Sequence, residues 1–271
     1  MQKIVVCITG VVNRSIKYTW DSINDNIIDQ LKKEYEVDIA IFNNNVEECL
    51  VDGVKVNNND MLMIPYDFLF EYKQTFIDFE VKKIEGEDKD FSSYDRWKNQ
   101  KKNGLRLMYV ESQVSKFLDE NKDKYTYALI TNADYFYLNK FPLECISNIR
   151  ENIIGTSHHW EAGDMCTDGF YIGQPNTISK IMKRIHYYYG VIQEYKNPNI
   201  LNYERILNEC IKFNNINRLK IDIFFVKIRA NLYLKNSAPE REKYNKMFKE
   251  FLNKNKDKKE SYAFLITNII E

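Results

Sequence analysis

The chain has 271 residues, of which 44% are hydrophobic and 14% aromatic, and its 39 Lys and Arg residues balance 39 Asp and Glu residues. This apolar content supports a sizeable core and excludes an intrinsically disordered protein, and the length is near the upper limit for one hydrophobic core. A formal net charge of zero gives no overall field to attract nucleic acid or an anionic membrane. Any anion must therefore be bound by a local site.

The cysteines and the N-terminus indicate the compartment. The five cysteines are odd in number and lack a CxxC pair or zinc spacing, which predicts reduced thiols at Cys7, Cys49, Cys145, Cys166 and Cys210. The first residues enter a strand-like run without the long apolar segment and cleavage site of a signal peptide, and no stretch of about 18 apolar residues predicts a membrane span. Together these features predict a cytoplasmic protein.

The first 42 residues have the pattern of a strand, a helix and a second strand. Residues 3–10 form an apolar, β-branched run that ends at a glycine, which is typical of a strand buried on both faces. After a predicted loop over 11–19, apolar residues recur at helical spacing from 20 to 31, and 37–42 reads as the next strand. The pattern predicts a βαβ unit.

The rest of the chain continues this alternation, less regularly at first. Short strands are predicted over 51–56 and 61–64, followed by an aromatic-rich segment over 66–79 and a charged, exposed loop or helix approach over 85–102. Beyond these, periodicity predicts helices over 105–118, 176–189, 203–213 and 239–253, strands over 125–131, 153–157, 169–173 and 219–229, and an apolar run over 262–270. The order indicates an α/β protein.

Ligands of open α/β sheets gather beyond the carboxyl ends of the strands, and the first polar cluster lies at such an end. It runs from Thr9 to Ser15, where Gly10 lets the backbone approach a ligand and Arg14 can grip a phosphate. The segment has neither the GxGxxG fingerprint nor the P-loop sequence. An ordinary turn with a solvent-facing Arg14 is the alternative.

The second cluster, Thr131-Asn132-Ala133-Asp134, follows a predicted buried strand. Asn132 and Asp134, two residues apart, can point to the same side and offer the oxygen ligands that Mn²⁺ or Mg²⁺ prefers. Such a cation neutralises a diphosphate leaving group. The alternative is a turn in which both side chains only cap backbone groups.

The third cluster spans residues 155–173 and combines histidines, carboxylates and a tryptophan. Trp160 can stack on a sugar face and His158 can complete a metal shell, while Asp168 is the preferred base or sugar-binding carboxylate. Histidines on a surface loop are the alternative. The spacing excludes the HExxH zinc motif, and no GxSxG elbow or kinase signature occurs in the chain.

Taken in order, these segments resemble small GT-A glycosyltransferases found in large DNA viruses and in bacterial surface-polysaccharide gene sets. The resemblance covers most of residues 3–231. Its matching segments are Gly10 and Arg14 leading to 19–23, then 132–136, 168–173, 204–207 and 228–229. It departs from the family at Asn132, where the usual motif has Asp, so metal dependence is open.

The resemblance implies a GT-A fold, which is a Rossmann-like α/β arrangement with a mixed, mostly parallel sheet flanked by helices. It implies one domain over 1–271, with a nucleotide-sugar half to about 138, an acceptor half over about 139–235 and a helical extension over 236–271. The implied reaction moves a hexose or deoxyhexose from a nucleotide-diphosphate donor, with UDP favoured, to a saccharide hydroxyl.

The motifs and the resemblance together give the candidate residues. Asp168 is the catalytic candidate, and Mn²⁺ or Mg²⁺ would be held by Asp134, Asn132 and His158. The remaining candidates face the donor nucleotide (Thr9, Gly10, Arg14, Asn132, Ala133, Asp134) or line the acceptor or phosphate side (Trp160, Glu161, Glu204, Arg229). A structural ion pair is the alternative for Glu204 and Arg229.

Two other functions are open. A nucleotidyltransferase would use a metal and a triphosphate, but it typically needs a glycine- and lysine-rich anion loop, and this chain has nine glycines and no such loop. A carbohydrate-binding or scaffold protein that keeps the fold without catalysis would agree with Asn132 in place of an aspartate.

Overall fold

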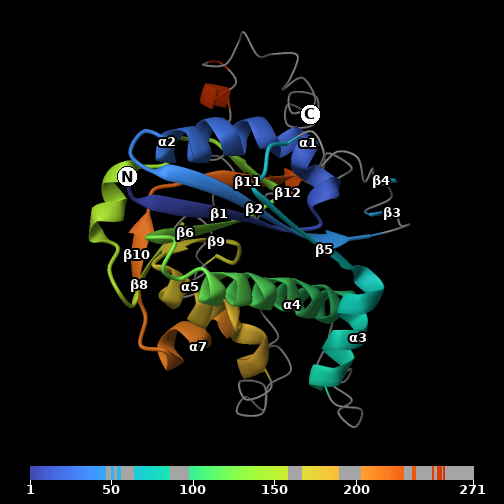
Figure 1. Cartoon of the computed structure of the whole chain (residues 1–271). Helices are drawn as coiled ribbons and strands as arrows, with labels where there is room; N and C mark the ends of the chain where they lie inside the picture. The colour runs from blue at the N-terminus through green and yellow to red at the C-terminus, as the bar shows by residue number, and fades with distance from the viewer. Residues whose placement is uncertain are drawn as a thin grey trace.

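The protein is an α/β molecule built on a seven-stranded sheet with helices on both faces (Figure 1). The computed structural model describes residues 1–46, 50–51, 54–55, 64–85, 98–157, 167–188, 203–228 and 234–235, together with 246, 249–251 and 253. No helix within these ranges is both long and apolar enough to cross a membrane.

The main sheet has the strand order β10-β8-β9-β6-β1-β2-β5. Its strands are β1 (Lys3–Gly10), β2 (Glu36–Asn45), β5 (Phe68–Lys73), β6 (Tyr127–Asn132), β8 (Ile153–Ser157), β9 (Phe170–Gly173) and β10 (Asn217–Ile221). Only β9 is antiparallel to its neighbours among these pairings. This mixed, mostly parallel sheet with flanking helices confirms the predicted fold class.

The strand order reverses at the centre of the sheet. From β1 the chain adds β2 and then β5 on one side, and β6 later joins β1 on its other side, with Thr9 opposite Asn132. In open α/β sheets a ligand binds beyond the carboxyl ends of the strands at such a reversal. The first two polar clusters of the sequence therefore meet at this position.

Alternating side chains of the central strand enter two separate cores. Ile4, Val6 and Ile8 face one core, and Val5 and Cys7 face the other, as the two-residue period of a strand requires. The first core is closed by α1 (Val12–Ile23), a π-helical turn (Asn24–Ile28) and α2 (Asp29–Leu31). The second is closed by α3 (Gln74–Glu85), α4 (Lys98–Glu120), α5 (Pro175–Met182) and α7 (Tyr203–Phe213).

A three-stranded antiparallel sheet lies on the α1 side of the main sheet (Figure 1). It consists of β7 (Tyr135–Tyr137), β11 (Phe225–Ile228) and β12 (Leu234–Lys235), with β11 in the middle. Only Ala133 and Asp134 separate the end of β6 from the start of β7. The second polar cluster is thus the crossing from one sheet to the other.

The remaining elements are the β3 (Leu50–Val51) and β4 (Val54–Lys55) hairpin and a 3-10 helix, η4 (Leu143–Asn148).

The structure corrects the predicted loop over 11–19, because α1 already begins at Val12. The side-chain oxygen of Asn43, at the end of β2, accepts the Val12 N–H at 3.0 Å. One of the unpaired N–H groups of the helix start is thereby satisfied from the neighbouring strand. Such a contact is invisible to local sequence patterns.

The predicted strand over 219–229 is also wrong, because it is two strands in two sheets. β10 ends at Ile221 and β11 begins at Phe225. Asn139 holds the bend between them: its amide nitrogen donates to the Asp222 carbonyl at 2.8 Å and its oxygen accepts the Phe224 N–H at 2.7 Å.

Smaller differences concern element ends. The segment 66–79 contains β5 and the first half of α3, Ile64 lies in a bend, and α4 starts at Lys98 within the predicted exposed run. The helix predicted over 176–189 is α5, a turn at Lys183 and a helical stretch over 184–188. The segment 262–270 and most of 239–253 lie outside the described residues.

A buried ion pair joins two helices beneath the sheet. Arg184 donates from Nε and Nη2 to the two carboxylate oxygens of Glu111 on α4, each at 2.6 Å, and both side chains are essentially unexposed. A bidentate pair of this kind fixes direction as well as distance. Helix α4 and residues 184–188 are thereby locked together.

Replacing Glu111 with Ala should lower the free energy of unfolding by about 3–5 kcal/mol, because Arg184 would stay buried without its carboxylate. Urea denaturation at neutral pH measures the loss. The control is Lys183→Ala, which breaks an ion pair to Asp119 whose side chains are 43% and 45% exposed and should cost no more than about 1 kcal/mol. Equal losses in the two variants would contradict the assigned role of the buried pair.

Candidate functional site

The ends of β1 and β6 are tied together through Asn132. Its side-chain oxygen accepts the Thr9 hydroxyl at 2.9 Å, and the Ala133 N–H donates to the Thr9 carbonyl at 3.0 Å. On the other side, the Asn132 N–H donates to the Gly169 carbonyl at 3.1 Å. A Cβ at Gly169 would lie 2.1 Å from the Asn132 amide nitrogen, so only glycine fits against this side chain. Asn132 is therefore bonded on both sides while remaining partly exposed.

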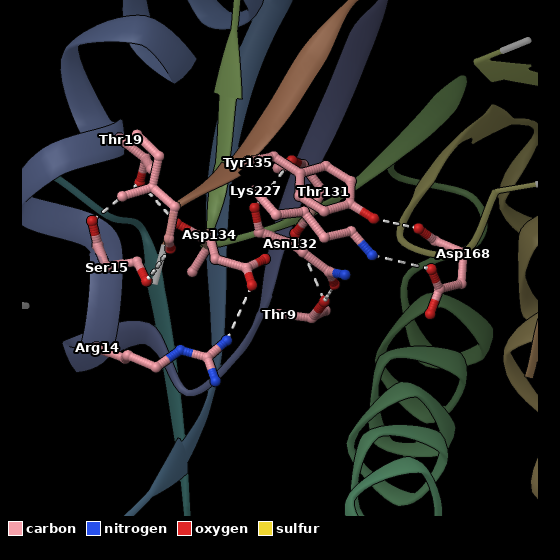
Figure 2. A network of polar contacts seen from close by, with 12 residues as sticks. Thr9, Arg14, Ser15, Thr19, Thr131, Asn132, Asp134, Tyr135, Asp168 and Lys227 are labelled. Carbon is pink, nitrogen blue, oxygen red and sulfur yellow. Dashed lines mark hydrogen bonds and ion pairs between the residues drawn. The ribbon is translucent and has the colours of Figure 1, made fainter. Parts of the chain in front are cut away.

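Arg14 and Asp134 form an ion pair across the crossing between the sheets (Figure 2). Arg14 lies in the first turn of α1, and its Nη2 is 2.9 Å from Asp134 Oδ2. Their side chains are only 16% and 9% exposed, so Arg14 does not simply face the solvent. The structure thus brings the first two sequence clusters into direct contact.

The backbone of the crossing is fixed on two sides. The Thr19 hydroxyl donates to the Ala133 carbonyl at 2.6 Å, and the Ile228 N–H donates to the Asp134 carbonyl at 2.8 Å. The Ser15 hydroxyl in turn donates to the Ile228 carbonyl at 2.7 Å. These bonds hold α1, the crossing and β11 in one arrangement.

Asp168 is held beside the end of β6 by its backbone. The antiparallel pairing of β9 with β6 places Phe170 opposite Thr131, and Asp168 stands just before that pair. The Tyr135 hydroxyl donates to the Asp168 carbonyl. The next residue, Gly169, has a φ of +89° and donates its N–H to the Tyr171 hydroxyl oxygen at 2.8 Å. The Asp168 carboxylate consequently has a defined position.

Lys227 completes the group, and the sequence analysis did not select it. It lies on β11 opposite Tyr135 of β7, and its Nζ is 3.3 Å from Asp168 Oδ1 and 5.3 Å from the centre of the Tyr135 ring. Figure 2 shows Asp134 and Lys227 between Arg14 and Asp168. The available signal was a single charged residue within the apolar strand Phe225–Ile228. We refer to Arg14, Asp134, Lys227 and Asp168 as the charged cluster.

The charge state of Asp168 follows from its surroundings. Burial alone would raise the pKa of this carboxyl, but the positive charges of Lys227 and Arg184 outweigh burial and hold the pKa below its usual range. Asp168 is therefore ionised at neutral pH. Burial raises the pKa of Tyr135 well above its usual value, so this hydroxyl stays protonated and remains a donor.

Four of the other candidate residues cannot be placed relative to the charged cluster. His158, Trp160, Glu161 and Arg229 lie outside the described residues. Glu204 is the second residue of α7, which packs on the core of the sheet face opposite α1. Gly10, with a φ of +110°, ends β1 beside the cluster, and no atom lies within 4 Å of a Cβ placed there.

Asp134 and Asn132 carry oxygens of the kind that Mn²⁺ and Mg²⁺ bind, and each already has a protein partner. Among the described residues, no three His, Cys, Asp or Glu side chains group closely enough to hold a metal ion.

Comparisons with known proteins concern the fold. No family model matches the chain, and no curated protein matches its sequence. Among solved structures, the chain is similar to mouse xyloside xylosyltransferase 1 in its apo form, with a TM-score of 0.43 and 7% identity over 81% of this chain and 84% of that one. A likeness of this degree says nothing about substrate or activity.

Replacing Lys227 with Met should raise the pKa of Asp168, because burial remains while one of the two opposing positive charges is lost. In the native protein the lowered Asp168 pKa stabilises the folded state at pH values above the ordinary carboxyl pKa of about 3.9. This stabilisation is lost as the pH falls through the lower pKa of the folded state. A pH titration followed by carboxyl ¹³C NMR measures the Asp168 pKa in the native protein and in Lys227→Met.

Lys183→Met is the matched control for this titration. Lys183 bonds Asp119 at 2.8 Å and opposes the effect of burial on the Asp119 pKa. This variant should raise the pKa of Asp119 and leave that of Asp168 unchanged. An unchanged Asp168 pKa in Lys227→Met would contradict the ion pair.

Proposed function

We propose that the protein is a glycosyltransferase that moves a sugar from a nucleotide-diphosphate donor, with a UDP-sugar favoured, to a saccharide hydroxyl. The observation that carries this proposal is the charged cluster at the carboxyl ends of β1 and β6, where the strand order reverses. This is the position at which open α/β sheets bind nucleotides. The order of the sequence motifs supports the same proposal.

Two cations serve the leaving group in this proposal. When the donor's glycosidic bond breaks, negative charge develops on the departing diphosphate and must be neutralised in place. Arg14 is already oriented by Asp134 and only partly exposed, so it need not reorganise to meet that charge. A divalent cation at Asp134, when bound, would add Lewis-acid stabilisation of the same oxygens.

Asp168 serves the reacting carbon. Its carboxylate is ionised and positioned through Tyr135, so it can accept the proton of an acceptor hydroxyl as that oxygen bonds to the sugar. The same negative charge beside the donor sugar would stabilise the positive charge of an oxocarbenium-like transition state. Both roles require the charged form that Lys227 and Arg184 favour.

The wider assignment is part of the proposal. We place the protein with the small GT-A enzymes of large DNA viruses and bacterial polysaccharide gene sets, acting in the cytoplasm of the bacterium or of the virus's host. The nucleotide-sugar half would reach about residue 138, which includes β1, β2, β6 and β7, and the later strands would face the acceptor.

The direct test is a thermal-shift screen of UDP-, GDP-, CMP- and dTDP-sugars with and without Mn²⁺. A ligand at about 100 times its Kd stabilises the folded state by about 2.7 kcal/mol, which corresponds to several degrees in Tm for a chain of this size. We expect a UDP-sugar to raise the Tm most and then to be turned over. Binding without transfer or hydrolysis would favour the inactive carbohydrate-binding alternative, and no shift with any donor would contradict the proposal.

Asp134→Asn should reduce sugar transfer at least roughly 100-fold, the scale of losing one electrostatic contact to a transition state. Asparagine keeps the shape of the side chain and removes the charge that faces Arg14 and a cation. The matched control is Asp119→Asn, which removes a carboxylate paired to Lys183 near the amino end of β6 and should leave turnover unchanged. Unchanged turnover in Asp134→Asn would rule out its role.

A further inference from the structure

Lys227 is a charged side chain within an otherwise apolar strand. Its neighbours Phe225, Val226 and Ile228 are buried, and its own side chain is 17% exposed. The Ile228 N–H bonds the Asp134 carbonyl, so the backbone beside Lys227 is fixed to the sheet crossing. An ammonium group is costly to bring into such a place unless negative charge awaits it. The position of Lys227 therefore calls for anionic partners.

The bond from Lys227 to its carboxylate is long. Nζ lies 3.3 Å from Asp168 Oδ1, whereas Arg14 and Asp134 are 2.9 Å apart and Lys183 and Asp119 are 2.8 Å apart. Charge-assisted bonds between nitrogen and carboxylate oxygen are usually about 2.7–2.9 Å. The Lys227–Asp168 pair is thus the longest of these three ion pairs.

The ring of Tyr135 lies beside this ammonium. Nζ is 5.3 Å from the centre of the ring, within the range of a cation–π contact. Tyr135 is fully buried, stacks on Phe225 at 3.9 Å between ring centres, and is bonded through its hydroxyl to Asp168. The cation consequently has a rigid surface beneath it and a defined direction.

We propose that Lys227 binds a phosphate oxygen of the donor's diphosphate, with Arg14 on the far side of Asp134 as the second cation. This inference rests on the proposed function and adds a diphosphate-binding residue to it. On donor binding, the ammonium turns from Asp168 to the phosphate, and no covalent bond changes. Because Asp168 then loses part of its positive surroundings, its affinity for a proton rises once the donor is bound.

The test measures binding of UDP, UMP and uridine by calorimetry, each with Mn²⁺ and with EDTA, to the full chain. Lys227→Met should weaken UDP binding roughly 10- to 100-fold, the scale of one hydrogen bond to a charged group, and should leave uridine binding unchanged. Lys227→Arg keeps the charge and should retain most of the affinity. Lys183→Met, the matched control near the amino end of β6, should bind UDP as the native chain does.

A double variant separates direct contact from an indirect effect. If Lys227→Met loses UDP only because an unpaired Asp168 repels the diphosphate, adding Asp168→Asn restores the affinity, and this result would overturn the inference. Direct contact predicts no restoration. Circular dichroism establishes that each variant is folded, and Lys227→Arg reports on the residue should Lys227→Met fail to fold.

The inference and the proposed function fail differently. Equal affinity of Lys227→Met and the native chain for UDP overturns the inference and leaves the function standing. Failure of the native chain to bind any nucleoside diphosphate, with or without Mn²⁺, overturns the function and the inference with it.

Discussion

The crossing of the chain from one sheet to the other at Ala133 and Asp134 is the constraint on which the site depends. These two residues connect β6 of the main sheet to β7 of the small sheet. The Ala133 carbonyl is bonded by α1, and the Asp134 carbonyl is bonded by β11. With the crossing fixed, Arg14 reaches Asp134 from the helix and Lys227 reaches Asp168 from the late strand. A change in this turn would displace both ion pairs together.

Both the whole chain and the charged cluster have a net charge of zero. The whole chain carries equal numbers of acidic and basic residues, and the charged cluster pairs two cations with two carboxylates. Partly buried charges without partners would be destabilising, so each pair stabilises its members within the charged cluster. A bound anion must then compete with carboxylates that are already present, which favours a multiply charged ligand over a singly charged one.

Sequence periodicity predicted the strand 3–10, the strand 153–157 and the helix 203–213 with the observed bounds. In each of these elements, a regular pattern of apolar residues matches the side chains that the fold buries. It also placed the clusters of Arg14 and Asp134 beyond the carboxyl ends of strands, but their ion pair was not predicted. The misplaced start of α1 and the single strand over 219–229 share one cause. Asn43 and Asn139, which decide these boundaries, are remote in sequence from what they bond. Lys227 was missed for the same reason, because its significance depends on the pairing of β11 with β7.

The bond from the Ser15 hydroxyl to the Ile228 carbonyl joins residues 213 positions apart, and Arg14 and Asp134 are separated by 120. Contacts of such high order form late, because the entropy of closing the intervening chain is lost before they can contribute. During synthesis, β1, β2 and β6 can pair while β11 is still unmade. The ribosome must therefore deliver the chain through Lys227 before the charged cluster can form, and a nascent chain that ends between Asp168 and Lys227 carries both carboxylates without the lysine that pairs with Asp168.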